Sequence, residues 1–423
     1  MSAEEVTVRA NWAGNYAYRA REIVAHRSVE EVQELVSRSS RIGFLGSRHS
    51  FNEIADSDVL IVLSGLPEIC EIDLAAATVT AGAGMTYGAL ALALARDGMA
   101  LANLASLPHI SIAGAVSTGT HGSGDANGNL ATSVAALELI RADGELVAVR
   151  RGDPDFDGCV VSLGALGAIV RVTLDIQPAY EVRQRVWEEV PLQAILERFD
   201  DVMSLGYSVS LMTLWEATLY LVWIKTRVQP GETEPVLELP GGRPAAHDMH
   251  PIPGLDPINC TPQMGVPGPW FERLPHFRMG FTPSNGNELQ SEFLIDRRHA
   301  REALAAVSAL GDLIRPVLQI CEIRTILADE LWLSPEYRRD TVAFHFTWQP
   351  DQARVEAALR VLEAALAPLH PRPHWGKVFV GEQMSMYELY PRLTDFVALA
   401  HRYDPRGAFR NPWLERFVFG SDL

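Results

Sequence analysis

Short apolar runs, separated by loops rich in glycine and proline, dominate the first 180 residues. These β-type runs predict strands at residues 42–45, 59–63, 69–73, 79–81 and 168–176. Helices are predicted over residues 28–39, where Ser28 and Glu31 match a capping box, and over residues 86–96. The runs at residues 134–141 and 145–150 flank Asp143 and Gly144, which predicts a β-hairpin.

The apolar pattern changes near Tyr180. Beyond it the pattern predicts helices at residues 192–205, 298–311 and 351–367, and strands at residues 207–214, 220–227, 288–294, 317–325 and 341–348. Residues 230–275 are dense in proline and glycine and too long for a simple connection, so we expect them to cover something or to join lobes. The sequence therefore predicts an α+β protein with a cofactor lobe, then a substrate lobe and a C-terminal return.

Composition argues against several classes of partner. The 423-residue chain has a net charge of −17, whereas nucleic-acid binding needs clustered lysine and arginine. No window of about twenty uncharged apolar residues occurs, and residues 1–11 are charged and lack an apolar signal core. We expect no membrane contact, a cytoplasmic location and a monomer.

The four cysteines are far apart in sequence, at Cys70, Cys159, Cys260 and Cys321. They form no CxxC pair and no Cys/His spacing typical of zinc sites. The spacing predicts buried free thiols and no metal site.

Lysine is rare in this chain. Among the 36 basic residues only Lys225 and Lys377 are lysines, and the others are arginines. Such a chain uses arginine wherever a positive charge suffices, so its two lysines can mark positions where a compact ammonium is needed. Chance at either position is the alternative.

Two loops carry the most informative chemistry. One follows the run at residues 41–45 and contains His49; the other extends from Ser106 to Gly124. Both are rich in Gly, Ser and Thr, so they expose backbone N–H groups and hydroxyls that can bind a pyrophosphate. Two such loops predict a dinucleotide held from both sides, with His49 near its ring end.

Other nucleotide-binding and hydrolase patterns fit poorly. Gly82 and Gly84 begin a G-x-G sequence, but Tyr87 stands where the dinucleotide fingerprint has its third glycine, and Leu104 where it has an acidic residue. Neither lysine follows a P-loop, and no G-x-S-x-G elbow occurs.

Six segments, in order, resemble the vanillyl-alcohol-oxidase (VAO/PCMH) type of FAD enzymes, and within it the branch of aldonolactone and alditol oxidases, most closely the alditol oxidases. They are Gly46-Ser-Arg-His49, Ser106-Leu-Pro-His-Ile-Ser-Ile-Ala-Gly114, Gly119-Thr-His-Gly122, Glu322-Ile-Arg324, His374-Trp-Gly-Lys377 and Asp404-Pro-Arg-Gly-Ala-Phe-Arg-Asn411. The resemblance implies an FAD-binding lobe of two α+β subdomains and an α+β cap domain whose antiparallel sheet covers the flavin. It places the FAD-binding domain at residues 1–178, the cap at 179–378 and a C-terminal segment returning to the FAD lobe at 379–423.

The resemblance also implies which residues bind the cofactor. His49 stands where the family attaches FAD covalently, while a small residue is more usual at the position of Arg48, for which we expect an exposed guanidinium. The expected FAD contacts are Phe44, Leu45, Gly46, Ser47, Arg48, His49, Ser50, Ser106, Ser111, Gly114, Thr118, Gly119, Thr120, His121 and Ile169. Ala105 matches the family position beside the flavin's C4a edge, where a small residue bears on oxygen access, and alanine there leaves oxidase and dehydrogenase activity both open.

The substrate residues follow partly from the pattern and partly from the resemblance. Glu322 and Arg324 alternate along a predicted strand, so they face the same side, where a buried charged pair is costly unless it meets a ligand or a partner. The resemblance implies that Glu322, Arg324 and Lys377 are catalytic, and that Ser106, His345 and Thr347 bind substrate with them. A satisfied ion pair, and for His345 a packed sheet histidine, are the structural alternatives.

The implied reaction is oxidation of a polyol's terminal primary alcohol to the aldehyde. Hydride passes to flavin N5, the hydroxyl proton passes toward Glu322 or Arg324, and O2 is then reduced to H2O2. An aldonolactone oxidase or dehydrogenase is the nearest alternative, and a non-catalytic flavin-binding protein or a nicotinamide-dependent reductase on the same FAD lobe is more distant.

Overall fold

The computed structural model describes residues 4–5, 9–229, 231, 239–281, 287–382 and 384–420. Within these ranges, no helix has both the length and the apolar surface required to cross a lipid bilayer. The described residues form four sheets, one of them only two-stranded, with covering helices, which confirms the predicted α+β class.

The N-terminal sheet has the strand order β1-β2-β4-β3. Its strands are β1 (Glu4–Glu5), β2 (Glu22–Ala25), β3 (Ile42–Leu45) and β4 (Val59–Val62), with helix α1 at Val29–Arg38. Ser28 caps α1 as predicted, since its hydroxyl accepts the Glu31 N–H. The other half of the capping box was wrong, because the Glu31 carboxylate accepts the N–H of Arg27 rather than that of Ser28.

A second, antiparallel sheet has the order β5-β6-β10-β8-β9. It comprises β5 (Cys70–Asp73), β6 (Thr78–Gly82), β8 (Val134–Ile140), β9 (Leu146–Arg150) and β10 (Ala168–Asp175). Helices α2 (Tyr87–Arg96), α3 (Ile112–Ser117) and α4 (Phe156–Cys159) accompany it, and β7 (Met99–Ala100) pairs with β11 (Gln177–Pro178). The predicted hairpin is confirmed, with Ile140 opposite Leu146 and Gly144 at a φ of 87° that favours glycine.

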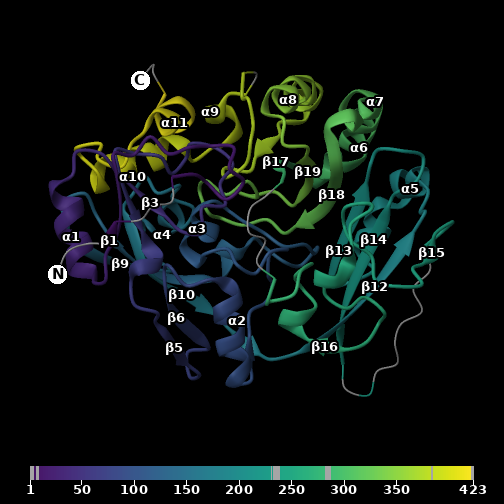
Figure 1. Cartoon of the computed structure of the whole chain (residues 1–423), viewed down its shortest axis with the longest axis horizontal. Helices are drawn as coiled ribbons and strands as arrows, with labels where there is room; N and C mark the ends of the chain where they lie inside the picture. Colours follow the sequence, from purple (N-terminus) through teal and green to yellow (C-terminus); the bar gives the residue numbers. More distant parts are fainter. Residues whose placement is uncertain are drawn as a thin grey trace.

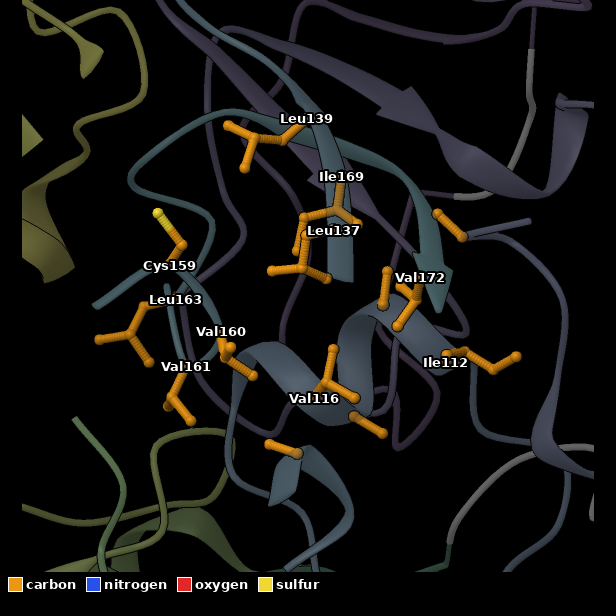
Figure 2. Close-up of a cluster of buried hydrophobic side chains, with 14 of the residues drawn as sticks. Ile112, Val116, Leu137, Leu139, Cys159, Val160, Val161, Leu163, Ile169 and Val172 are labelled. Atoms are coloured by element: carbon orange, nitrogen blue, oxygen red, sulfur yellow. The ribbon is translucent and has the colours of Figure 1, made fainter. Parts of the chain in front are cut away.

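Figure 2 shows the core of this region, where α3 packs against the face of β8 and β10. Ile112 and Val116 of the helix lie near Leu137 and Val172 of the sheet, and all four are almost fully buried. This packing fixes the start of α3, and therefore the loop that precedes it, against the sheet.

The second half of the chain forms a nine-stranded sheet. Eight of its strands follow the order β15-β12-β14-β13-β18-β19-β17-β20, and the ninth, β16, pairs with β12. Its strands are β12 (Glu181–Glu188), β13 (Ser208–Thr213), β14 (Leu221–Val228), β15 (Arg243–Pro244), β16 (Gly268–Pro269), β17 (Leu289–Asp296), β18 (Leu318–Ile326), β19 (Thr341–Trp348) and β20 (Arg372–Pro373). Every pairing within it is antiparallel. Its helices are α5 (Leu192–Met203), α6 (Ala300–Ala309), α7 (Gly311–Ile314) and α8 (Gln352–Leu366). Strand β12 was missed, and the helix predicted over 298–311 is divided between α6 and α7.

The C-terminal helices α9 (Met386–Leu389), α10 (Leu393–Tyr403) and α11 (Pro412–Leu414) return to the N-terminal lobe, where Figure 1 shows α10 and α11 in yellow near α1 and β3. The Ile42 N–H donates to the Ala408 carbonyl (2.8 Å), which ties this return to the start of β3. The predicted return is therefore present, although α10 itself was not predicted. The division at residues 178 and 378 stays a prediction.

The predicted covering segment at residues 230–275 is only partly described, because residues 230 and 232–238 lie outside the described ranges. Its described part adds β15 and β16 to the edge of the large sheet and brings His250, Ile252 and Leu255 to the wall of the main cavity. The cysteine prediction was wrong for Cys70, which is exposed because it lies on edge strand β5; Cys159, Cys260 and Cys321 are buried free thiols.

Candidate active site

A cavity of about 420 Å³ lies between the two lobes. Every predicted site residue except Gly119 lines it: Phe44, Leu45, Gly46, Ser47, Arg48, His49, Ser50, Ser106, Ser111, Gly114, Thr118, Thr120, His121, Ile169, Glu322, Arg324, His345, Thr347 and Lys377. Gly119 instead forms the turn after α3 at a φ of 66°, where a β-carbon would lie 3.0 Å from Pro335. The two glycine-rich loops of the N-terminal lobe and the central strands of the large sheet therefore line one cavity.

The two glycine-rich loops hold each other. The Ser47 N–H donates to Ser111 Oγ (3.2 Å), and the Ser111 N–H donates to Ser47 Oγ (3.1 Å). A β-carbon on Gly46 would lie 2.0 Å from Ser111 Oγ, so only glycine permits this approach.

Arg48 is not the exposed residue that we expected. Its backbone is left-handed, with a φ of 61°, and its half-buried guanidinium donates to the Ala10 carbonyl (2.9 Å). The Trp12 N–H in turn donates to the Arg48 carbonyl (2.9 Å). Arg48 therefore fastens the N-terminal segment over the loop that carries His49.

His49 lies against two aromatic rings. It stacks on Trp12 with ring centroids 4.3 Å apart, and its Nε2 contacts Nε2 of His109. Burial, and then the neighbouring His109, hold the pKa of His49 well below its ordinary value. The ring is therefore neutral near pH 7 and keeps a lone pair.

The turn that carries Lys377 is tied to the same loop. The Phe51 N–H donates to the Gly376 carbonyl (2.7 Å), and the Asn52 amide donates to the carbonyls of Trp375 and Lys377 (both 2.8 Å). These bonds fix the ammonium of Lys377 relative to His49, although the two residues are far apart in the sequence.

Glu292 on β17 is the hub of the charged groups. Its carboxylate accepts from Lys377 Nζ (2.7 Å) and Arg324 Nη2 (2.6 Å), and His121 Nε2 lies 3.2 Å away. Burial alone would raise the pKa of Glu292, but Lys377, His121 and Arg324 together lower it well below its ordinary value. Glu292 is thus a buried anion that holds two predicted catalytic cations.

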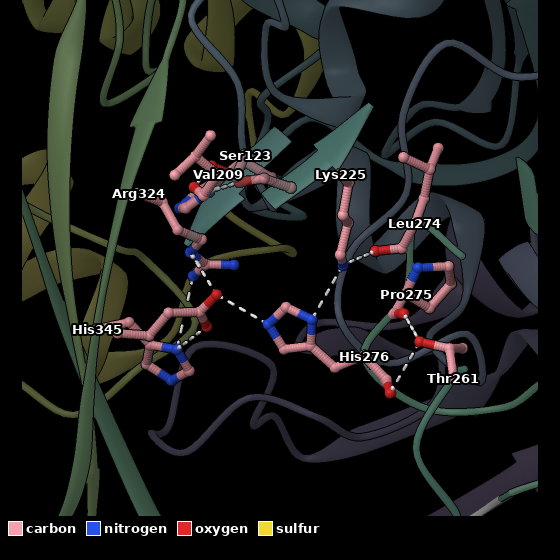
Figure 3. Close-up of polar contacts among 12 residues, drawn as sticks. Ser123, Val209, Lys225, Thr261, Leu274, Pro275, His276, Arg324 and His345 are labelled. Atoms are coloured by element: carbon pink, nitrogen blue, oxygen red, sulfur yellow. Dashed lines mark hydrogen bonds and ion pairs between the residues drawn. The ribbon is translucent and has the colours of Figure 1, made fainter. Parts of the chain in front are cut away.

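Glu322 on β18 faces the cavity beside Glu292. One carboxylate oxygen lies 2.8 Å from His276 Nε2 and 3.8 Å from Arg324 Nε, while the other lies 3.7 Å from His345 Nδ1. Burial would raise the pKa of Glu322, but Arg324 and His276 lower it well below the ordinary value. Figure 3 shows the labelled side chains of Arg324, His345 and His276 directed toward one another.

Strand register explains the convergence. His345 on β19 is opposite Glu292 of β17 on one side and Glu322 of β18 on the other. Two residues along, Thr347 is opposite Gln290 and Ile320. A row of ionisable side chains and a row with hydroxyl and amide groups therefore cross the sheet side by side.

Three residues of this site were missed as functional candidates. Glu292 carries the same signal as Glu322, since Glu288, Gln290 and Glu292 alternate on a predicted strand and share a face. His109 lies within the segment Ser106 to Gly114, which resembles the family, but no role was predicted for it. His276 follows the proline-rich segment in an irregular loop, and no local pattern points to it.

The walls of the cavity suit a flavin dinucleotide. Residues 43–50 and 105–121 contain no Asp or Glu, so the paired loops offer N–H groups and hydroxyls to an anion without a competing carboxylate. At the other end, neutral His49 and the cation Lys377 face the same space. The residues present therefore fit FAD.

Comparisons with known proteins agree with this arrangement. Two family profiles match, one described as an FAD binding domain over residues 20–150 and the other as D-arabinono-1,4-lactone oxidase over residues 284–417. Alditol oxidase of Streptomyces sp. (strain IKD472) is 48% identical over 419 residues, which cover 98% of this chain and 100% of that protein. L-gulono-1,4-lactone dehydrogenase of Mycobacterium tuberculosis is 29% identical over 97% of this chain and 98% of its own length. A crystal structure of cholesterol oxidase from Brevibacterium sterolicum has a TM-score of 0.77 at 14% identity over 99% of this chain and 97% of that one, so it shares the fold.

Proposed function

Because the chain belongs to the FAD-dependent oxidoreductase family of alditol and aldonolactone oxidases, we propose that it oxidises polyols such as xylitol, sorbitol and glycerol. The terminal primary alcohol becomes an aldehyde, and O2 is reduced to H2O2. The observation that carries this proposal is the convergence of Glu322, Arg324 and Lys377 on the cavity that also contains His49.

FAD is held by the two loops and, we propose, covalently through His49. When bound, it supplies the hydride acceptor and passes the electrons on to oxygen. The neutral ring of His49 is the nucleophile that such a bond requires. Acid precipitation of the protein tests the bond, because a colourless pellet with all yellow chromophore in the supernatant would contradict it.

Glu322 is the proton acceptor of the reaction. The pKa of Arg324 is raised by the two carboxylates that outweigh its burial, so the guanidinium keeps its proton and Arg324 is no candidate base. Glu322 remains ionised and accepts the hydrogen bond of the substrate hydroxyl. Its weak basicity suffices, since loss of hydride from the carbon makes that hydroxyl strongly acidic.

The remaining cavity groups orient the substrate and balance its charge. Lys377 provides positive charge where negative charge develops during hydride removal. His345 and Thr347, two positions apart on β19, donate to or accept from hydroxyls farther along the polyol, and Ser106 lines the same cavity. Their spacing suits a chain that carries a hydroxyl on successive carbons.

Anaerobic mixing with polyols tests the proposal directly. We expect xylitol, sorbitol or glycerol to bleach the flavin under nitrogen, and readmitted oxygen to restore the colour with one equivalent of H2O2. A flavin that no polyol bleaches would refute the function and favour a non-catalytic flavin-binding protein. NADPH serves as the control for a nicotinamide-dependent reductase.

A sugar-1,4-lactone is the second candidate substrate. It is favoured by the profile at residues 284–417 and by the 29% identical lactone dehydrogenase. The higher identity to the alditol oxidase over the full chain places the polyol first. Faster bleaching by L-gulono-1,4-lactone than by any polyol would reverse this order, and bleaching without H2O2 on reoxidation would indicate a dehydrogenase.

A further inference from the structure

Both lysines of this arginine-rich chain lie at the charged cluster. Lys377 contacts Glu292, as described above. Lys225, on β14, is 1% exposed and lies behind Glu322, separated from it by the ring of His276. The proposed reaction gives Lys377 a role but leaves Lys225 without one.

The three groups form a line from the cavity into the protein (Figure 3). His276 Nε2 lies 2.8 Å from a carboxylate oxygen of Glu322, and the other ring nitrogen, Nδ1, lies 3.2 Å from Lys225 Nζ. Lys225 Nζ also donates to the Leu274 carbonyl. We propose that Lys225 is a positioning residue that carries the positive charge of this line, so that His276 stays a neutral donor to Glu322.

Donor and acceptor rules fix the tautomer. An ammonium can only donate, so the ring nitrogen that faces Lys225 must be the unprotonated one. The proton of the neutral ring then lies on Nε2, where it points at the carboxylate of Glu322. An isolated lysine holds a proton about four pKa units more tightly than an isolated histidine, so a single proton in this line resides on Lys225.

The surrounding groups act on this proton from every side. The pKa of Lys225 is lowered to about 7, chiefly by burial and in part by Arg324, while Glu322 and Cys260 act in the opposite direction. Burial lowers the pKa of His276 to about 4; Lys225 and Arg324 contribute to this, and Glu322 opposes it. The edge of Trp223 lies against the His276 ring, with centroids 4.7 Å apart.

The backbone of His276 is fixed as firmly as its ring. Its N–H donates to the Ser106 carbonyl (3.2 Å), and its carbonyl accepts from the Thr261 N–H (2.9 Å). The backbone of His276 is therefore held between the glycine-rich loop and the proline-rich segment. What remains adjustable is the protonation of the ring, which burial disfavours and Lys225 disfavours further.

The consequence concerns the basicity of Glu322. A neutral N–H donor orients the carboxylate, whereas an imidazolium at 2.8 Å would also pair with its charge and reduce its ability to take the substrate proton. If Lys225 is replaced by a neutral residue, Nδ1 no longer faces a cation, and the carboxylate favours protonation of the ring. The charge then moves from residue 225 to residue 276, directly beside the base.

This inference rests on the proposed function for its kinetic test, which uses Lys225→Met in the flavin-loaded enzyme. We expect the rate constant for flavin reduction by xylitol to show a new acid limb in Lys225→Met, below the ordinary histidine pKa of about 6.5 because the ring stays buried, with about a tenfold lower rate on its acid side. Lys225→Met/His276→Gln should lose this limb, because the glutamine amide still donates to Glu322 but does not titrate. Arg227→Met, which removes a cation two residues along β14 beside Tyr180 and Tyr207, is the matched control and should keep the wild-type profile.

A second measurement needs no turnover. In 15N-histidine NMR spectra, assigned by the signal that His276→Gln removes, His276 of the wild type should be neutral and protonated on Nε2 from pH 5 up to about pH 7, the range in which Lys225 is an ammonium. The same ring in Lys225→Met should take up its second proton at a higher pH than in the wild type. A wild-type ring that is doubly protonated at pH 6, or superimposable rate profiles of Lys225→Met and wild type, would overturn the inference. If polyols fail to bleach the wild-type flavin, the proposed function fails, and the NMR result still decides the role of Lys225.

Discussion

Replacing Lys377 by methionine separates the electrostatic role of this residue from its structural one. Lys377 is bonded to Glu292, whose side chain is 0% exposed and is also held by Arg324 and His121. Loss of one partner of a buried ion pair typically costs about 3–5 kcal/mol of folding free energy. Because Arg324 still compensates Glu292, we expect Lys377→Met to lose about half of that.

Catalysis should suffer more than stability. Removing a preorganised charge from a site where charge develops typically slows a reaction by about 10²–10³-fold. We therefore expect a slowing of flavin reduction by xylitol of this order in Lys377→Met, measured by anaerobic stopped-flow absorbance. The thermal unfolding midpoint of the same protein reports the structural cost.

The control is Lys377→Met/Glu292→Gln, in which both charges are absent. This variant should recover most of the lost thermal stability, since no uncompensated carboxylate remains buried. Its flavin reduction should stay as slow as that of the single variant. Near-normal reduction in Lys377→Met, or recovery of the rate together with stability in the double variant, would refute the electrostatic role.

Three further changes have sharp expected outcomes. Asp329 lies near Glu336, and burial together with that carboxyl raises its pKa to about 7. Its stabilising contribution is therefore full below about pH 4 and is lost as the pH rises through about 7. Asp329→Asn should gain roughly 2–4 kcal/mol relative to wild type in urea unfolding at pH 8, and no gain would contradict the raised pKa. Gly46→Ala places a carbon 2.0 Å from Ser111 Oγ, so the purified variant should retain little flavin, as read from the absorbance ratio at 450 and 280 nm. His49→Ala should give a colourless pellet on acid precipitation, and a yellow pellet would move the covalent bond to another residue.

How much the sequence could predict depends on how local each signal is. The strand at Thr341–Trp348 and the helix at Tyr87–Arg96 have strong periodicity and clear ends, and both were predicted within a residue or two. Strand β12 was missed, because Glu181–Glu188 carries five charged or amide side chains whose burial depends on the neighbouring strand and on the segment after it. Helix α10 was missed because its apolar face is defined only by contact with the N-terminal lobe.

The site divides in the same way. Residues on loops with unusual local composition, such as those around Gly46 and Ser111, could be identified from the sequence. The partners of the charged residues could not be identified from the sequence. They depend on the register of three neighbouring strands and on the loop that follows the proline-rich segment. His276 reaches Glu322 from 46 positions away in the sequence, and nothing in its local pattern distinguishes it from a surface histidine.

The balance of charge around the cavity links these observations. Below the Lys225 pKa of about 7, Arg324, Lys377 and Lys225 supply three positive charges while Glu292 and Glu322 supply two negative ones, so the cluster then carries one surplus positive charge. A buried surplus of this kind is costly unless negative charge arrives to meet it. Removal of hydride from an alcohol and its deposition on an acceptor create that negative charge within the cavity. The same surplus explains why the two lysines matter more than their number suggests: Lys377 contacts Glu292 directly, and Lys225 acts on Glu322 through the ring of His276.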